Sequence, residues 1–80
     1  MEMGRMMLSQ LSPGMGGVVI EMVGTPALEM RLEDLGLTEG TRIVCLHRSP
    51  AGTPAAYEIR GAVIALRRED AAQIIVEAEP

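Results

Sequence analysis

Residues 31–41 constrain the fold more than any other segment, because they combine a helix end, a glycine stop and a tight turn into a strand. Gly36 stands where a helix commonly ends in the left-handed conformation, which glycine adopts without a steric cost. Gly40 closes a turn before residues 42–48, whose β-branched and apolar residues predict a strand. The segment therefore predicts a corner between a helix and a strand.

Four leucines predict how this corner packs. Leu28, Leu32 and Leu35 recur at i, i+4 and i+7, so we expect them on one face of the helix. If the helix stops at Gly36, Leu37 folds back onto Leu32, which is the apolar contact that often accompanies a Schellman cap.

The rest of the chain predicts short strands separated by glycine and proline. Residues 17–23 are rich in β-branched residues, which predicts a strand. Thr25 is a suitable N-cap for a helix over residues 26–35, and Pro26 fits its first turn. The further elements are strands at 42–48, 56–60 and 62–67, one helical turn at 68–72 and a last strand at 74–77. Five strands with helical insertions favour a small β-barrel, because closure removes exposed edges, but this pattern leaves an α+β sandwich equally open.

The length of 80 residues predicts one domain, which we place at residues 8–77, with residues 1–7 as a frayed N-terminal leader. Leu8 and Leu11 predict a short segment that docks on this domain. A single cysteine favours a reducing compartment, and no apolar stretch reaches the roughly 20 residues of a membrane span. We therefore expect a cytoplasmic protein without membrane insertion.

The composition argues against several classes of binding protein. Tyr57 is the only aromatic residue, whereas grooves for proline-rich peptides and single-stranded nucleic acids depend on several aromatics. The net charge is −4, so the chain has no general attraction for phosphate backbones. We therefore expect no nucleic-acid partner.

Cys45 and His47 are the residues most capable of chemistry. They lie two apart on a predicted strand, so we expect their side chains on the same face. No third residue is evident to orient the imidazole, and we therefore expect no catalytic site and no enzyme. The pair supplies two of the four ligands of a tetrahedral metal site, which makes a weak or intermolecular Fe²⁺ or Zn²⁺ site an alternative. The seven methionines also raise a soft-metal interpretation, but we favour their role as adaptable packing residues.

Three motifs occur in an order and at a spacing typical of one family. They are a Leu-Gly-Leu-x-x-Gly corner at residues 35–40, a hairpin with two prolines and a glycine at residues 49–54, and an Ala-Leu-Arg-Arg-x-Asp-Ala segment at residues 65–71. Over residues 8–77 the chain resembles the ferrous iron transport protein A (FeoA) family.

The resemblance implies a mainly β fold with short α-helices, namely a small SH3-like β-barrel of about five strands with a helix inserted after the first. It also implies a small accessory protein of bacterial ferrous iron uptake, an interaction module rather than an enzyme. Such a protein acts at the cytoplasmic face of the inner membrane with the large permease that carries a GTP-binding domain, and reaches the membrane through this partner.

Two surfaces are candidates for binding the permease: the helix with its corner, and the hairpin at residues 49–54. The candidate residues are Met30, Glu33, Asp34 and Leu37 on the first surface and Pro50, Gly52 and Pro54 on the second. Prolines pre-order the hairpin, which lowers the entropic cost of binding. Ala51 and Thr53 stand where the family has Leu and Asp, so an apolar contact and a turn-forming carboxylate are missing. We expect Met30 to be exposed, and we favour its interpretation as a single surface apolar residue of the kind that needs no explanation. A partner contact is the second interpretation.

Three alternatives remain open. The chain resembles SH3-like domains at the C-terminal ends of iron-dependent repressors, which makes it a candidate for a detached metal-responsive regulatory domain. A small transition-metal carrier would use Cys45, His47 and the methionines. A homodimer is a further alternative, because small barrels self-associate through unpaired strands.

Overall fold

The computed structural model describes residues 4–79, which form a six-stranded antiparallel sheet with two α-helices and one 3-10 turn. The elements are β1 (Arg5–Met7), η1 (Leu8–Gln10), β2 (Gly16–Met22), α1 (Pro26–Asp34), β3 (Arg42–Arg48), β4 (Ala55–Ile59), β5 (Ala62–Leu66), α2 (Arg68–Ala71) and β6 (Ile74–Ala78). The strand order is β1-β6-β2-β3-β4-β5, so β1 and β5 are the two edges. Among the helices within residues 4–79, none has the length and apolarity needed to cross a membrane.

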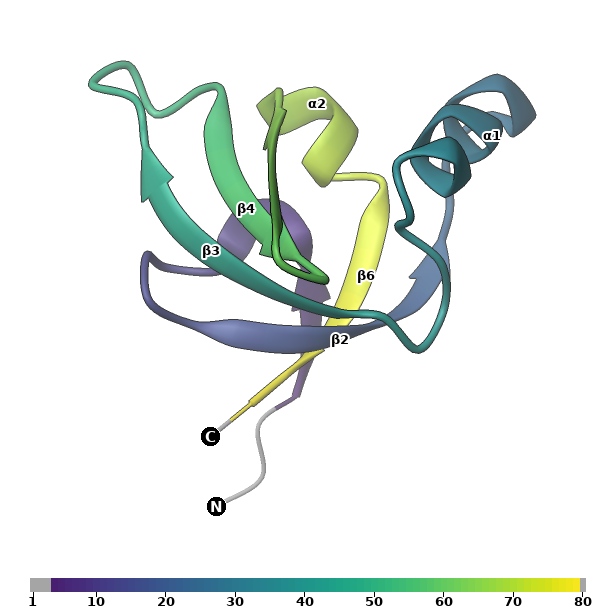
Figure 1. The fold of residues 1–80 in the computed structure, drawn as a ribbon, viewed down its shortest axis with the longest axis horizontal. Helices are drawn as coiled ribbons and strands as arrows, with labels where there is room; N and C mark the ends of the chain where they lie inside the picture. The colour runs from purple at the N-terminus through teal and green to yellow at the C-terminus, as the bar shows by residue number, and fades with distance from the viewer. Residues whose placement is uncertain (1–3, 80) are drawn as a thin grey trace.

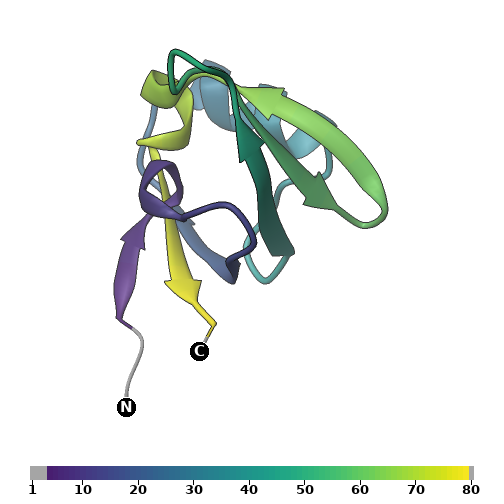
Figure 2. The ribbon, with the colours of Figure 1, turned by 90° about the vertical axis from the view of Figure 1, so that its left-hand side faces the viewer.

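The sheet curls so that β4 and β5 come over the interior formed by β2 and β6 (Figures 1 and 2). Its concave side holds a core of leucine, isoleucine, valine and alanine, with Tyr57 as the only aromatic side chain. Every strand from β2 to β6 contributes buried residues, for example Val19, Ile43, Leu66 and Val76. The core therefore links strands that are far apart in the sequence.

The predicted corner after α1 is present. Gly36 has φ +92°, and its N–H donates to the Glu33 carbonyl at 2.9 Å. The Leu37 N–H donates to the Leu32 carbonyl at 2.9 Å, and both leucine side chains are fully buried. These two bonds are the 5→2 and 6→1 bonds of a Schellman motif, which confirms the predicted cap.

Leu35 does not share the buried face expected for it, since its side chain is 45% exposed. The helix ends at Asp34, and Leu35 is the C-cap residue, beyond the last residue of regular helix. Leu37, which folds back across the helix end, is buried in its place. Leu28 is half-buried and packs against the core, as expected.

The N-terminal segment differs from the expected frayed leader. Residues 5–7 form β1, which pairs with β6 through Met6 opposite Val76, and Met6 packs against the core. This adds a sixth strand to the five that the sequence predicts. Residues 1–3 of the expected leader lie outside the described part of the chain.

The segment that follows β1 docks on the sheet as predicted. Leu8 and Leu11 are fully buried. The Arg48 guanidinium from the end of β3 donates to the Ser9 carbonyl at 2.8 Å and also to the Leu11 carbonyl. One guanidinium nitrogen of Arg48 therefore ties this segment to the end of β3.

Candidate functional site

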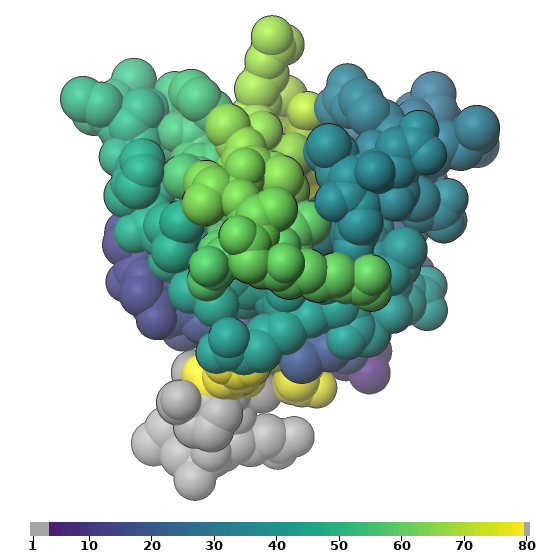
Figure 3. All heavy atoms as spheres, viewed as in Figure 1, coloured from purple at the N-terminus to yellow at the C-terminus, as the bar shows by residue number. Residues whose placement is uncertain are grey.

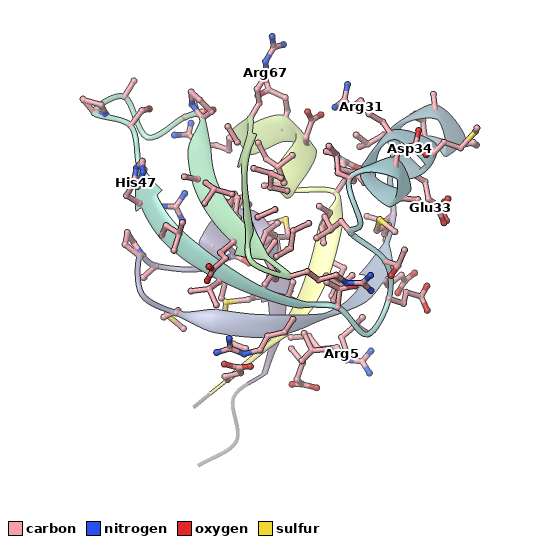
Figure 4. The ribbon with its side chains drawn as sticks, viewed as in Figure 1. Arg5, Arg31, Glu33, Asp34, His47 and Arg67 are labelled. Carbon is pink, nitrogen blue, oxygen red and sulfur yellow. The ribbon has the colours of Figure 1, made fainter. Side chains whose placement is uncertain are left out.

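Helix α1 presents an acidic outer surface with one large apolar side chain. Thr25 caps its start, with the hydroxyl accepting from the Leu28 N–H at 3.2 Å. Met30 is 65% exposed, and Glu33 and Asp34 are also exposed. Figure 4 labels both residues on α1, with Glu33 projecting clear of the helix. We call Met30, Glu33 and Asp34 the α1 surface.

Leu37 was expected on this surface, but it is fully buried. Its backbone closes the Schellman motif, which turns its side chain into the core. The residue therefore holds the corner in place and offers no contact area to a partner.

The loop at residues 49–54 joins β3 to β4 and is held by its own hydrogen bonds. The Gly52 N–H donates to the Ser49 carbonyl at 2.8 Å, and the Ser49 N–H donates to the Pro54 carbonyl at 3.1 Å. Gly52 has φ +84°. Pro50 and Pro54 are exposed, whereas Gly52 is half-buried. We call residues 49–54 the β3–β4 loop.

The β3–β4 loop is also tied to α2. The Thr53 hydroxyl accepts from the Arg68 N–H at 3.0 Å, at the start of α2. A Cβ at Gly52 would lie only 2.7 Å from the Arg68 guanidinium, so the arginine closes over the glycine. Thr53 thus does by its hydroxyl what a carboxylate at this position would do, since both accept hydrogen bonds from an unpaired helix N–H.

The two candidate surfaces lie at the same end of the molecule. Figure 1 shows the β3–β4 loop, α2 and α1 side by side at the end opposite the chain termini. The space-filling view in Figure 3 shows a hollow between α1 and the central column formed by α2 and β5. One partner face could therefore contact the loop and the helix together.

A cleft of about 630 Å³ separates α1 from α2. Arg31 of α1 crosses it and donates to the Asp70 carboxylate at 2.7 Å. The arginine side chain is largely exposed, so this ion pair contributes at most about 1 kcal/mol. Sequence reasoning missed the pair, because the two residues are 39 positions apart and no local pattern joins them. Thr53 and Arg68 were missed for the same reason.

Cys45 and His47 are not on the same face of β3, contrary to expectation. Cys45 pairs with Tyr57 and His47 with Ala56, so the register shifts by one residue between them. This bulge breaks the two-residue alternation of the strand. Cys45 is fully buried, whereas His47 is exposed and lies near the end of β3 (Figure 4).

The surroundings of Cys45 also disfavour metal binding by this residue. Burial raises the pKa of the Cys45 thiol, although the positive charge of Arg48 acts in the opposite direction. A thiol that stays protonated at neutral pH is a poor metal ligand and nucleophile. Within residues 4–79, no group of three or more His, Cys, Asp and Glu side chains lies close enough to hold a metal ion.

Comparisons with known proteins agree on one family. The model of the FeoA domain family matches residues 6–78. A curated relative from Porphyromonas gingivalis is 35% identical over 72 residues and is described as an Fe(2+) transport protein A/Fe(2+) transporter FeoB fusion protein. The match covers 90% of this chain but only 8% of that relative, so the chain corresponds to a small part of a much longer protein.

Solved structures show the same fold. The solution structure of FeoA protein from Chlorobium tepidum is 33% identical, with a TM-score of 0.88 over 94% of this chain and 71% of that chain. The crystal structure of Stenotrophomonas maltophilia FeoA complexed with zinc is 26% identical, with a TM-score of 0.77 over 92% of this chain and 95% of that one. That protein is described as an SH3 domain protein, and the likeness confirms the SH3-like fold expected here.

Proposed function

The chain belongs to the FeoA domain family, and from this premise we propose that it is a non-catalytic accessory protein of ferrous iron uptake that acts on a FeoB-type Fe²⁺ transporter with a GTP-binding domain. The observation that carries the proposal is the Porphyromonas gingivalis relative, in which a segment matching this chain is part of one polypeptide with the transporter FeoB. Fusion keeps a domain at high effective concentration near its partner. A domain in this role acts on the transporter through an interface.

The α1 surface and the β3–β4 loop are the residues we assign to that interface. Both lie at the end of the molecule opposite the termini (Figure 1). The loop is already ordered by its own hydrogen bonds and its bond to α2, so it loses less conformational entropy when it binds the transporter. Glu33 and Asp34 would meet a basic face of the transporter, which favours the correct orientation during association. Met30 would supply an adaptable apolar contact.

This role would place the protein at the cytoplasmic face of the inner membrane, held there by the transporter. Binding of the accessory protein could change the transporter only if its affinity differs between the transporter's nucleotide states. We therefore propose that affinity for the transporter differs between its GTP-bound and GDP-bound forms.

Metal binding by the accessory protein itself is a separate question. The sequence suggested Cys45 and His47 as weak ligand candidates, together with the methionines for a soft metal, and a metal could be shared between two copies through the exposed His47. A metal carrier or a metal-responsive regulatory domain would each bind Fe²⁺ or Zn²⁺ stoichiometrically without any transporter. The test below includes these outcomes.

The test is a binding measurement with the FeoB-type transporter of the same organism in lipid nanodiscs, under anaerobic conditions with Fe²⁺ kept reduced. The purified chain is titrated against transporter loaded with GDP or with a non-hydrolysable GTP analogue. A variant combining Met30→Ser, Glu33→Lys and Asp34→Lys should bind at least about tenfold more weakly, a change typical of losing central interface contacts. The matched control is Glu21→Lys with Glu77→Lys, which makes the same change of charge on β2 and β6 instead of α1.

Binding that is the same for the triple variant and the control would contradict the α1 surface as the interface. No binding to the transporter in any nucleotide state would contradict the proposed function. In that case, stoichiometric Fe²⁺ or Zn²⁺ binding that is lost with His47→Ala would support the carrier or regulatory alternative.

A further inference from the structure

Strand β5 forms one edge of the sheet, and its sequence gives this edge little protection. Its five residues, Ala62–Leu66, are all apolar. Val63 is 64% exposed. Edge strands are usually protected by charged residues, proline or a bulge, because an open edge is a template for another strand. Strand β5 has none of these, and its register with β4 is regular.

The hairpin register shows which backbone groups are free. Arg60 and Gly61 both have positive φ, at 50° and 83°, as in the two-residue turns that join antiparallel strands. Such a turn is closed by a hydrogen-bonded pair, here Ile59 with Ala62. Every second residue from Ala62 therefore bonds to β4, and the residues between them, Val63 and Ala65, direct their N–H and C=O groups away from it.

No other strand within residues 4–79 covers this edge. In Figure 2 the β4–β5 hairpin projects from the body of the sheet, with β5 on its outer side. The edge thus offers two backbone donors and two acceptors over the length of a short strand. This is the arrangement used when a peptide adds to a sheet as an extra strand.

Positive charges stand at both ends of the edge. Arg60 precedes β5, and Arg67 and Arg68 follow it. None of the three forms an ion pair within the part of the chain that the structure describes. Figure 4 shows the Arg67 side chain pointing away from the rest of the molecule. Glu58, opposite Val63, and the exposed Glu69, next to Arg68, are acidic, so the three arginines leave the edge with a small positive charge, although the whole chain has a net charge of −4.

This charge pattern disfavours a second copy as the occupant. In a two-fold antiparallel pair of β5 strands, the start of each strand lies beside the end of the other. Arg60 of one copy would then face Arg67 and Arg68 of its partner copy, and like charges placed opposite each other destabilise a strand pair. An occupant with acidic ends would instead gain ion pairs at both ends, in either strand direction.

We propose that the free edge of β5 binds an extended segment of a partner protein as an added strand, with acidic residues of that segment opposite Arg60 at one end and Arg67 and Arg68 at the other. Val63 and Ala65, in the middle of β5, supply backbone hydrogen bonds that do not depend on the sequence of the partner segment. The arginines select the charge of the partner. The site lies on β5 and does not include the α1 surface, so it does not depend on the function proposed above.

The probe for this site is a synthetic peptide, Glu-Glu-Thr-Val-Thr-Val-Glu-Glu, and its matched control carries Lys in place of every Glu. Each is titrated into the ¹⁵N-labelled chain and followed by the amide signals. The acidic peptide should bind with a Kd of about 1 mM or lower, and the amide signals of Val63 and Ala65 should shift most. The lysine peptide should bind at least about fivefold more weakly, and added salt should lower the affinity of the acidic peptide.

Two variants test the mechanism. Ala65→Pro removes the outward N–H without breaking a bond to β4 and should abolish binding, whereas Ala65→Val keeps the N–H and should bind like the original chain. Arg67→Glu should lower the affinity for the acidic peptide by about threefold or more. If Ala65→Pro disturbs folding, the Arg67→Glu titration still decides the charge requirement.

The proposal is overturned if the signal changes lie away from β5, if both peptides bind equally, or if a folded Ala65→Pro variant binds normally. It is also overturned if the chain alone dimerises through β5, as shown by concentration-dependent changes at Val63 and Ala65. That result would make a second copy the occupant.

Discussion

The two connections that flank β3 reach an ordered structure by different means. The corner at residues 35–41 takes its shape from bonds between residues close in sequence, above all the two bonds of the Schellman motif. It is joined to the rest of the fold by Leu37, which is buried in the core, and by the backbone bonds of Gly40 and Thr41 with Val19. The β3–β4 loop has short-range bonds too, but it is fixed to the body of the protein by Thr53 and Arg68, which are 15 residues apart. The conformation of the corner is therefore set by neighbouring residues, whereas the placement of the loop depends on side-chain contacts with α2.

This difference predicts unequal responses to mutation. Loss of a buried leucine in the corner should destabilise the whole domain, because the core is small and shared by all parts of the sheet. Loss of the loop's anchor should instead free the loop while leaving the core intact.

Leu37→Ala should lower the free energy of unfolding by about 2–5 kcal/mol, since it removes a fully buried side chain and leaves a cavity. Chemical denaturation measures the change. The matched control is Leu35→Ala, the same substitution two residues away at a side chain that is 45% exposed, and it should cost less than about 1 kcal/mol. Equal losses at the two positions would refute the structural role assigned to Leu37.

Gly36→Ala should cost about 1–2 kcal/mol, because its φ of +92° is strained for any residue with a Cβ. The nearest atom to the added Cβ, Ile59 Cδ1 at 3.9 Å, is at an ordinary contact distance, so backbone strain accounts for the loss. Gly40→Ala, at φ +88° with no neighbouring atom within 4 Å, is the comparison and should cost a similar amount. A much larger loss at Gly36 alone would show that a steric clash dominates.

Thr53→Ala should cost about 0.5–1 kcal/mol, the usual effect of losing a side-chain acceptor at a helix start. More informative is hydrogen exchange, which should speed up for Gly52 and the first amides of α2 and stay unchanged for Leu37. Thr53→Ser keeps the hydroxyl and should preserve protection. Unchanged exchange in Thr53→Ala would mean that the loop does not depend on α2.

Asp70→Asn should have a smaller effect on stability, below about 1 kcal/mol, because the arginine of the Arg31–Asp70 ion pair is largely exposed. Its removal frees Arg31 and should increase exchange at the C-terminal half of α1. Arg31→Gln tests the same pair from the other side and should give a similar result. Unchanged exchange in both variants would show that packing alone holds α1 against the sheet.

The smallest effect is expected at the far end of the corner, where Arg42 holds Glu79 in a forked contact at 2.7 and 2.8 Å. The hydrogen bond from Arg42 lowers the pKa of Glu79 below its usual value of 4.5. The carboxylate therefore stabilises the folded state above the unfolded pKa, and this contribution is lost as the pH falls through the folded pKa. Glu79→Gln should unfold slightly more easily at pH 7 and should match the original chain at the lowest pH that both tolerate. A gap that widens toward acid would reverse the assigned sign.

Patterns within about seven residues predicted much of this structure. The helix, its cap at Thr25, the stop at Gly36 and the strand that follows all appear as expected, because their signals lie in neighbouring residues. Predictions failed where one residue changed the local geometry. The bulge in β3 separated Cys45 from His47. The corner buried Leu37 as its predicted contact with Leu32 required, and this burial removes Leu37 from the partner-binding surface. A strict two-residue alternation cannot foresee a bulge, since the extra residue is set by the partner strand.

Residue patterns by themselves determined the helix-to-strand corner and the order of the elements from β2 to β6, because these follow from periodicity, glycine conformation and capping. The choice of a mainly β, SH3-like fold over an α+β sandwich came from the family resemblance. Only the tertiary structure decided that residues 5–7 join the sheet, that Thr53 caps α2, that Arg31 reaches Asp70 across the cleft, and that β5 is left as an open edge between arginines. Each of these depends on residues brought together over long stretches of chain. Such contacts form only when burial of the shared core compensates the entropy of closing the intervening loops.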